Sequence, residues 1–233
     1  MIGVIGGMGP LATADFFRKV IAATPVHDDA GHVPLLIQSD PRIPPRPAAI
    51  LGRGPSPLPS LLAARERLLV AGAQGLVMPC NTAHHWYAEL VAGCPVPFPS
   101  IVDTACDEAG RVAATGARVG LVATRATLAA GLFDAPLAAR GLASMTPSDE
   151  LLDSLILPAI AQVKAGRLEP AGAMMARAVQ ALLDDGADAV ILGCTEAPLA
   201  LETAPAPLRA RCVDSTDALA RATVALWRRL CEA

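Results

Sequence analysis

The chain has 233 residues, 53% of them hydrophobic and 3% aromatic, with a formal net charge of −3. This balance provides a core for one large domain or two small ones, and it shows no basic stripe that would indicate a nucleic-acid partner. The first ten residues lack the basic segment of a secretory signal, and the longest uncharged run, 68–88, holds proline and polar residues, so we expect a cytoplasmic protein that does not enter a membrane.

Short apolar runs alternate with longer segments of helical periodicity along the whole chain. In the first half, strands are predicted at 2–6, 35–39, 75–78 and 98–102, and helices at 13–23, 60–71, 82–92 and 103–114. In the second half, strands are predicted at 118–123, 142–145, 189–192 and 211–214, and helices at 128–139, 150–165, 170–185, 197–202 and 215–231. This alternation is typical of an α/β fold with parallel sheets covered by helices on both faces.

Two sequence elements occur twice. The segment GAQGLVMPCNTA ends near Cys80 and GADAVILGCTEA ends near Cys194, an offset of 114 residues (194 minus 80). The segments that begin at Ile2 and Val119 also align, with Gly3 on Gly120 at an offset of 117. Duplication predicts two pseudo-symmetric α/β lobes, and chance similarity of short apolar strands is the alternative. We expect one lobe at 1–100 plus 215–233, a second at 101–214, and the active site in the cleft between them.

The segment 39–60 breaks this pattern because it is rich in proline. A connection of this length in a compact domain is a functional lid, a disordered insert or a rigid surface link. The sequence leaves these alternatives open.

Each repeated cysteine directly follows a predicted strand and precedes a helix. Asn81 and Thr82 after Cys80, and Thr195 after Cys194, are residue types that cap helices. The helix dipole would then favour the thiolate below its free pKa of roughly 8.5. The remaining cysteines form no C-x-x-C pair, so we expect no metal site and assign them to packing or the surface: Cys94, Cys106, Cys212 and Cys231.

Two cysteines on opposite walls of one cleft suit paired acid–base chemistry. One thiolate would remove a proton from a carbon while the other thiol donates one to the opposite face, which inverts a stereocentre. Contact of each sulfur with that carbon at about 3–3.5 Å predicts a sulfur–sulfur separation of roughly 6–7 Å.

The motifs GGMGPLAT (6–13), MPCNTAH (78–84) and GCTE (193–196) resemble the signatures of the aspartate/glutamate racemase superfamily, and most closely those of cofactor-independent aspartate racemases. The resemblance covers nearly the whole chain. It implies two α/β domains, two catalytic cysteines at Cys80 and Cys194, a small amino-acid substrate, no pyridoxal phosphate or metal, and a homodimer. The presence of both cysteines favours racemisation in both directions.

The resemblance also implies a set of substrate contacts. Arg46 in IPPRP matches an arginine that binds a substrate carboxylate, and Lys164 in QVKAG matches a lysine of the family, although a solvated cation at a helix end is the alternative. The other residues implied as substrate contacts are Met8, Gly9, Asn81, Thr82, Thr124, Thr195 and Glu196. Thr124 could instead cap a helix, and Glu196 could instead complement a helix N-terminus.

Departures from the family pattern leave the substrate open. Pro45 and Pro47 stand where the family has Asp and Thr, so aspartate, glutamate or another amino acid remains the candidate. A decarboxylase or a cis–trans isomerase of the same superfamily is an alternative reaction.

Three further hypotheses about function have less support in the sequence. A dinucleotide fingerprint at Gly7, Gly9 and Ala12 holds Pro10 inside its turn. A Cys–His hydrolase would pair Cys80 with His84 or His85 and leave Cys194 without a role. A non-enzymatic small-molecule binding protein would exchange no substrate proton.

Overall fold

A computed structural model describes residues 1–232, and chain contacts divide it into two compact units. The first unit consists of Met1–Ile101 and Thr216 onward, and the second of Val102–Ser215. Within the described residues, no helix is both long enough and apolar enough to cross a membrane.

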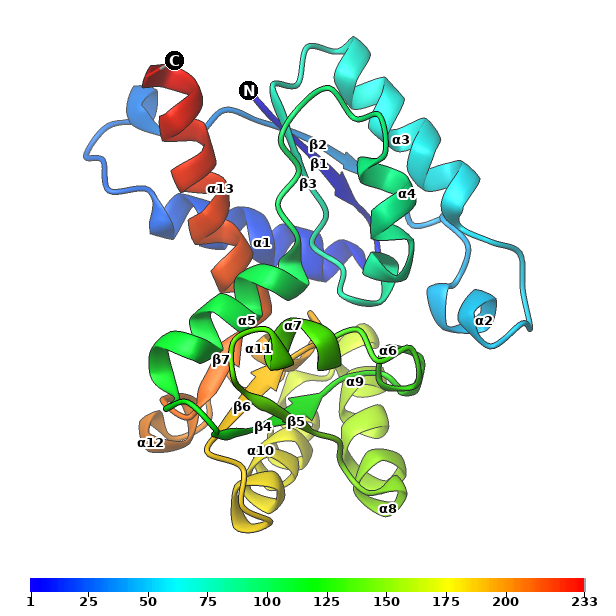
Figure 1. Ribbon diagram of the computed structural model, residues 1–233, viewed down its shortest axis with the longest axis vertical. Coiled ribbons are helices and arrows are strands. Elements are labelled where there is room, and N and C mark those ends of the chain that lie inside the picture. Colours follow the sequence, from blue (N-terminus) through cyan, green and yellow to red (C-terminus); the bar gives the residue numbers. More distant parts are fainter. Residues whose placement is uncertain (233) are drawn as a thin grey trace. The chain divides into compact units, whose positions relative to one another are not determined.

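The first unit is built on a parallel sheet with the strand order β2-β1-β3 (Figure 1). Its strands are β1 (Ile2–Gly6), β2 (Leu35–Ser39) and β3 (Gly75–Val77). Its helical elements are α1 (Pro10–Ala23), η1 (Asp29–Gly31), α2 (Arg46–Ile50), α3 (Leu58–Val70), η2 (Thr82–Trp86), α4 (Tyr87–Val91) and α13 (Ser215–Glu232).

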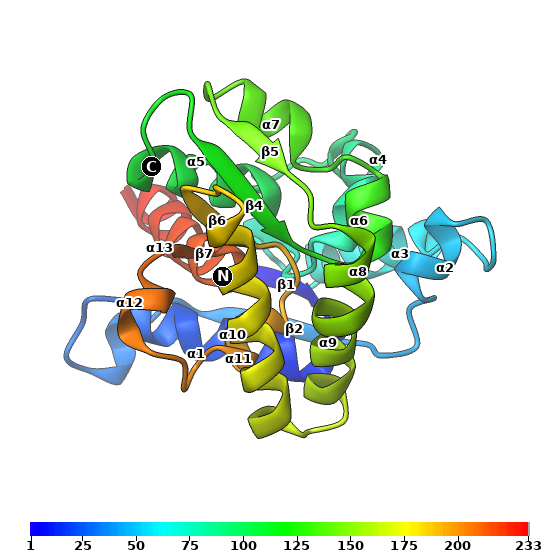
Figure 2. The same cartoon turned by 90° about the horizontal axis from the view of Figure 1, so that it is seen from below.

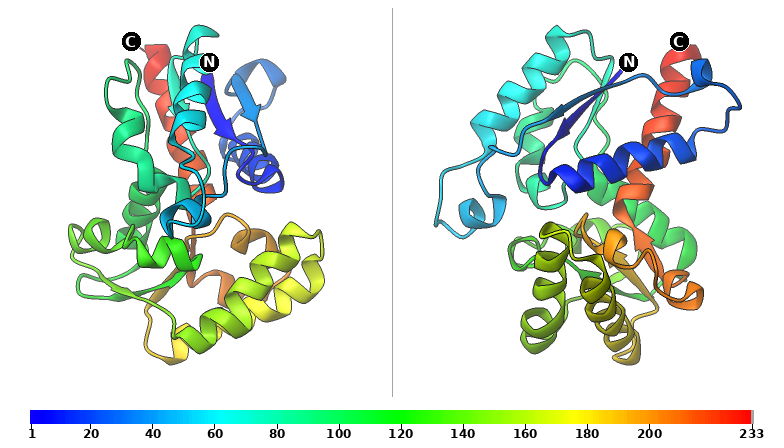
Figure 3. Two further views of the ribbon diagram at one scale, coloured as in Figure 1. Left: turned by 90° about the vertical axis from the view of Figure 1, so that its right-hand side faces the viewer. Right: turned by 180° about the vertical axis from the view of Figure 1, so that it is seen from behind.

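The two faces of this sheet are covered by different helices (Figure 3). Side chains alternate along a strand, so Gly3 and Ile2 of β1 face opposite ways. A Cβ added to Gly3 would lie 3.1 Å from Leu68 Cβ of α3, whereas Leu226 of α13 approaches the other face, beside Ile2 and Gly75. The helix α1 lies on that second face, where Phe17 and Ile21 flank Leu35 and Ile37 of β2.

The second unit holds a parallel sheet with the order β5-β4-β6-β7. Its strands are β4 (Arg118–Val122), β5 (Ala143–Met145), β6 (Ala189–Leu192) and β7 (Cys212–Asp214). Its helical elements are α5 (Ile101–Val112), α6 (Arg125–Ala129), α7 (Asp134–Ala138), α8 (Asp149–Leu151), a π-helical turn (Leu152–Ile156), α9 (Leu157–Lys164), α10 (Leu168–Asp184), α11 (Ala197–Ala200) and α12 (Ala206–Arg209). Figure 2 shows α9 and α10 on one side of this sheet and α7 on the other.

The two sheets repeat one topology, which confirms the predicted α/β fold with two parallel sheets flanked by helices. In each unit the first strand in sequence is central and lies between the second and the third. The repeated glycines also share an environment, because a Cβ on Gly120 would lie 3.3 Å from Leu182 Cβ of α10, much as one on Gly3 would meet α3. Phe16 and Phe133, which lie at the same offset of 117 (133 minus 16), are both fully buried.

Three predicted elements are wrong. The helix predicted at 82–92 is the 3₁₀ turn η2 followed by the short helix α4. Residues 98–102 form no strand, because Pro95, Pro97 and Pro99 lack the N–H groups that a ladder requires, and α5 already begins at Ile101. The helix predicted at 128–139 is broken into α6 and α7 around Gly131, which has a φ of 59°. The proline-rich segment is ordered as α2 and the loops beside it.

Candidate active site

Cys80 follows the carboxyl end of β3. The strand ends at Val77, Pro79 removes the next ladder donor, and the Cys80 N–H bonds to the Met78 carbonyl at 2.8 Å. The side chain of Cys80 is 5% exposed and packs in the core formed with α3 and α4. The β3–η2 connection therefore fixes this thiol at the edge of the first sheet.

The residues after Cys80 do not cap a helix as predicted. Asn81 itself has helical backbone angles and makes no side-chain cap, and the 3₁₀ turn η2 begins at Thr82. Asn81 and Thr82 are both buried, with 2% and 8% of their surface exposed. Local backbone geometry therefore overrides their capping preference.

His84 lies four residues beyond Cys80, and both of its ring nitrogens contact main-chain groups. Its Nδ1 lies 2.8 Å from the Cys80 carbonyl oxygen, and its Nε2 accepts the Ile101 N–H at 3.1 Å. Both ring nitrogens are therefore engaged, and His84 is not placed as the base of a Cys–His hydrolase. The next residue, His85, is exposed and meets Trp86 edge-on.

Cys194 occupies the matching position after β6 in the second unit. Its Sγ donates to Glu196 Oε2 at 3.0 Å, and the Thr195 hydroxyl donates to the same oxygen at 3.4 Å. Lys164 Nζ, at the end of α9, lies 3.9 Å from Glu196 Oε1. Cys194, Thr195 and Glu196 are buried, whereas the Lys164 side chain is 56% exposed.

The electrostatics of Cys194 contradict the expected thiolate. Burial, and next the Glu196 carboxylate, raise the pKa of the Cys194 thiol well above its ordinary value. The expected cap is also absent: Glu196 precedes α11, which has four residues and is too short to offset burial of the sulfur. Burial and the neighbouring carboxylate therefore both favour the protonated thiol at Cys194.

The loop residues Met8 and Gly9 join β1 to α1. Met8 is buried, and the Gly9 carbonyl accepts from the Thr13 hydroxyl at 2.9 Å as α1 begins at Pro10. Gly7 has a φ of 91°, and an added Cβ would meet the backbone of Asp40 at 2.4 Å. Close packing against Asp40 thus explains this glycine without a bound pyrophosphate.

Arg46 begins α2 and is half-buried. Its Nη1 donates to the carbonyl oxygens of Ile43 and Pro44, both at 3.1 Å, which anchors the guanidinium to its own loop. Its buried Nε has no hydrogen-bond partner within residues 1–232. The Nε–H of Arg46 is therefore a donor for which residues 1–232 supply no acceptor.

Thr124 and the other cysteines are involved in local structure. Thr124 caps α6 by accepting from the Thr127 N–H. Within residues 1–232, no disulfide joins any of the six cysteines. Cys106 is fully buried, and burial raises its pKa to about 12. Across residues 1–232, no cluster of three or more His, Cys, Asp or Glu side chains could hold a metal ion.

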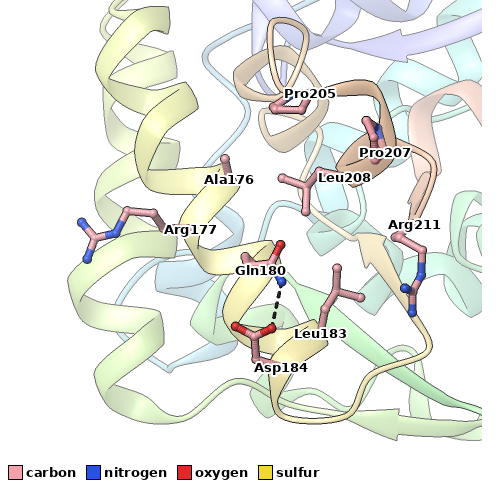
Figure 4. A pocket seen from close by; sticks show the side chains of 9 residues that line it. All are labelled: Ala176, Arg177, Gln180, Leu183, Asp184, Pro205, Pro207, Leu208 and Arg211. Atoms are coloured by element: carbon pink, nitrogen blue, oxygen red, sulfur yellow. Dashed lines mark hydrogen bonds between the residues drawn. The ribbon is translucent and has the colours of Figure 1, made fainter.

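A surface groove of about 620 Å³ lies elsewhere in the second unit, between α10 and α12 (Figure 4). Arg211 is bonded to the Ala187 and Asp188 carbonyls, and Gln180 to Asp184. The groove contains none of the predicted site residues. It is therefore not a candidate for the chemistry of Cys194.

The structure thus brings Cys194, Thr195, Glu196 and Lys164 together in one unit, and Cys80 together with Asn81 and Thr82 in the other. His84 is the residue that sequence reasoning missed as a support of the site. Its spacing of four from Cys80 was the signal, because one helical turn returns a side chain to the carbonyl four residues earlier.

Comparisons with known proteins agree with these features. The family model described as Asp/Glu/Hydantoin racemase matches residues 5–223. The aspartate racemase of Picrophilus torridus is 27% identical with a TM-score of 0.84, over 97% of this chain and 94% of that one. An aspartate racemase homologue from Pyrococcus horikoshii is 25% identical with a TM-score of 0.76, over 97% and 98% of the two chains.

A glutamate racemase of Desulforudis audaxviator is 28% identical over 152 residues, which are 62% of this chain and 54% of that protein. The chain therefore spans about half the length of this curated relative. Together, the family match, the two parallel sheets and the paired cysteines lead to one conclusion: the chain belongs to the Asp/Glu/Hydantoin racemase family and is an isomerase.

Proposed function

We propose that this isomerase is a cofactor-independent racemase of an acidic amino acid, aspartate or glutamate, and that Cys80 and Cys194 are its two acid–base groups. The observation that carries the proposal is the equivalence of the two cysteines. Each follows the third strand of its sheet, at the same place in a repeated topology, and each is buried. A duplicated site with one sulfur from each copy suits a reaction whose two directions are mirror images.

In the proposed mechanism, Cys80 as thiolate removes the α-proton from one face of the substrate, and the Cys194 thiol delivers its proton to the other face. The Glu196 carboxylate accepts a hydrogen bond from the Cys194 thiol at 3.0 Å, and it therefore favours the protonated thiol before the proton is delivered. In the reverse direction the two sulfurs exchange roles. Protons are conserved, because the enzyme has one thiol and one thiolate both before and after each turnover.

The substrate carboxylates require cationic and N–H partners. Arg46, with an unsatisfied Nε, and Lys164, largely exposed beside Glu196, are the proposed cations. Thr82, two residues after Cys80, and Thr195, directly after Cys194, are the proposed hydroxyl donors. These groups would stabilise the charge that develops on the α-carboxylate as the proton leaves.

The aspartate racemase of Picrophilus torridus and the glutamate racemase of Desulforudis audaxviator support an acidic substrate, but they differ in which one. Pro45 and Pro47, beside Arg46, remove side-chain hydrogen-bonding groups from the loop that would contact the substrate. We therefore propose the acidic class and leave the choice within it to experiment. A homodimer in the cytoplasm is the proposed form.

The test is incubation of the purified protein in D2O with aspartate, glutamate and neutral amino acids of each hand. We expect loss of the α-proton NMR signal and formation of the opposite enantiomer for an acidic substrate. Cys80→Ala and Cys194→Ala should each lower racemisation by at least about 1,000-fold, because both bases are needed. Cys106→Ala is the matched control, since it removes a buried thiol that has no role in the proposal.

Full activity in either cysteine variant would contradict the two-base assignment. Consumption of a substrate without α-exchange would indicate another reaction of the superfamily, such as decarboxylation. No exchange with any amino acid would contradict the racemase proposal itself.

A further inference from the structure

His84 is a buried titratable side chain that the proposed proton transfer does not use. It is 7% exposed and lies in η2, four residues after Cys80. Its ring stacks on Tyr87 with centroids 5.1 Å apart and planes inclined by 14°. The Tyr87 hydroxyl in turn donates to the Phe98 carbonyl, so the stacked pair is held on both sides.

The two hydrogen bonds of His84 determine its tautomer. A carbonyl oxygen only accepts, so the contact of 2.8 Å with the Cys80 oxygen requires a proton on Nδ1. A main-chain N–H only donates, so the contact of 3.1 Å with Ile101 requires a lone pair on Nε2. The imidazole is therefore neutral, with its proton on Nδ1.

These bonds join the Cys80 loop to the start of α5. One end is the peptide of Cys80 itself. The other is Ile101, the first residue of α5 and the last residue of the first unit, after which the chain enters the second unit at Val102. The Ile101 N–H belongs to the first turn of a helix, where the helix supplies no acceptor of its own. The ring of His84 supplies it.

We propose that His84 is a positioning residue that ties the Cys80 loop to the start of α5, and thereby holds the Cys80 sulfur in register for proton transfer. The inference rests on the proposed function for its effect on catalysis, although the tie can be tested without it. Loss of the tie leaves the Cys80 thiol chemically intact but shifts its position. Misplacement lowers the rate of the chemical step more than it weakens substrate binding.

The first test uses the unmodified protein. In a long-range 1H–15N NMR spectrum of the histidine rings, we expect one of the four histidines to show the Nδ1–H pattern over the neutral pH range, and His84→Asn to remove that signal. An Nε2–H pattern, or a charged imidazolium, for His84 would overturn the proposal. The outcome does not depend on any enzymatic activity.

The second test compares variants of neighbouring histidines. His84→Phe keeps a ring to stack on Tyr87 and loses both hydrogen bonds, whereas His85→Phe changes an exposed neighbour and serves as the matched control. Since local opening exposes a buried thiol, we expect iodoacetamide to label Cys80 roughly fivefold faster or more in His84→Phe, with labelling of the exposed Cys231 unchanged. Equal Cys80 labelling in a folded His84→Phe protein would contradict the tie.

The third test measures catalysis and distinguishes the two hydrogen bonds of His84. For racemisation, we expect kcat to fall about 10-fold or more in His84→Phe with KM within about twofold, and His85→Phe to match the wild type. His84→Gln can place an oxygen near Nε2 and should recover part of kcat, because it restores the Ile101 contact. A fall in kcat no larger than that of His85→Phe would overturn the positioning role. Absence of racemisation in the wild type would refute the proposed function and leave the tautomer and labelling results to decide the tie.

Discussion

At the scale of single residues, the unequal surroundings of the two cysteines are the main feature. Cys194 shares a buried site with the Glu196 carboxylate two residues after it, whereas the corresponding position after Cys80 in the sequence is Thr82. A duplicated scaffold therefore carries two thiols with different environments. We infer that the resting enzyme holds its proton on Cys194.

Glu196→Gln tests this inference. The amide keeps an oxygen that can accept from the thiol but removes the negative charge, so the pKa of Cys194 should fall while burial still keeps it above the ordinary value. The pH dependence of iodoacetamide labelling at Cys194, followed by peptide mass spectrometry, should shift to lower pH. Labelling at Cys231 is the internal control. An unchanged profile for Cys194 would show that burial alone sets its acidity.

Cys106 allows a test of stability against pH. Burial raises its pKa to about 12, so the folded state retains a proton that the unfolded chain releases near its free value. This contribution to the free energy of unfolding is fully present below the unfolded pKa of roughly 8.5 and is lost as pH rises above it. Between about pH 7 and about pH 10, the wild type should lose about 2 kcal/mol more than Cys106→Ala in urea unfolding. Parallel losses in the two proteins would contradict the buried thiol as the cause.

At the scale of elements, β1 packs closely on β3 and on the segment between α3 and β3. A Cβ on Gly3 would lie 2.8 Å from Leu76 Cδ2 and 3.0 Å from Ala73 Cβ, so Gly3→Ala should destabilise the protein by about 1–3 kcal/mol through overpacking. Gly110, near the end of α5, faces open space, so Gly110→Ala should instead stabilise by about 0.5–1 kcal/mol. Urea unfolding of the two variants provides the comparison. A Gly3→Ala protein as stable as the wild type would contradict the packing described for β1.

The elements also show what the sequence could predict. Strands β1, β2 and β6 have the predicted bounds: β1 and β6 are fully buried runs between helices, and β2 begins with the half-buried apolar run of Leu35, Leu36 and Ile37. The strand predicted at 98–102 is wrong because the prediction relied on the local apolar pattern. In the structure, the N–H groups that the three prolines lack prevent a strand ladder there. Capping by Asn81 and Thr195 failed because the segments after the cysteines are a 3₁₀ turn and a four-residue helix, which the sequence pattern did not distinguish from longer helices.

Within the site, the positions of both cysteines after β3 and β6 could be predicted from the repeat. The raised pKa of Cys194 could not, since it arises from burial and from a carboxylate whose direction depends on the turn before α11. The bonds of His84 to Cys80 and Ile101 also required coordinates. Ile101 lies seventeen residues away in sequence, and nothing in the local pattern relates the two.

At the scale of the whole molecule, the chain builds the same sheet topology twice and returns with α13 to the unit in which it began. The proposed two-base mechanism would give this duplication a chemical purpose, because it uses one acid–base group on each face of one carbon. The central claim is that Cys80 and Cys194 provide those groups. The claim requires both sulfurs to contact the same substrate carbon.

The most direct measurement is a crystal structure of the protein with bound aspartate or glutamate, whichever exchanges its α-proton. The account predicts the two sulfurs on opposite faces of the substrate α-carbon, each about 3–3.5 Å from it and thus roughly 6–7 Å apart. Both sulfurs on one face, or one of them directed into a separate pocket away from the substrate, would contradict it.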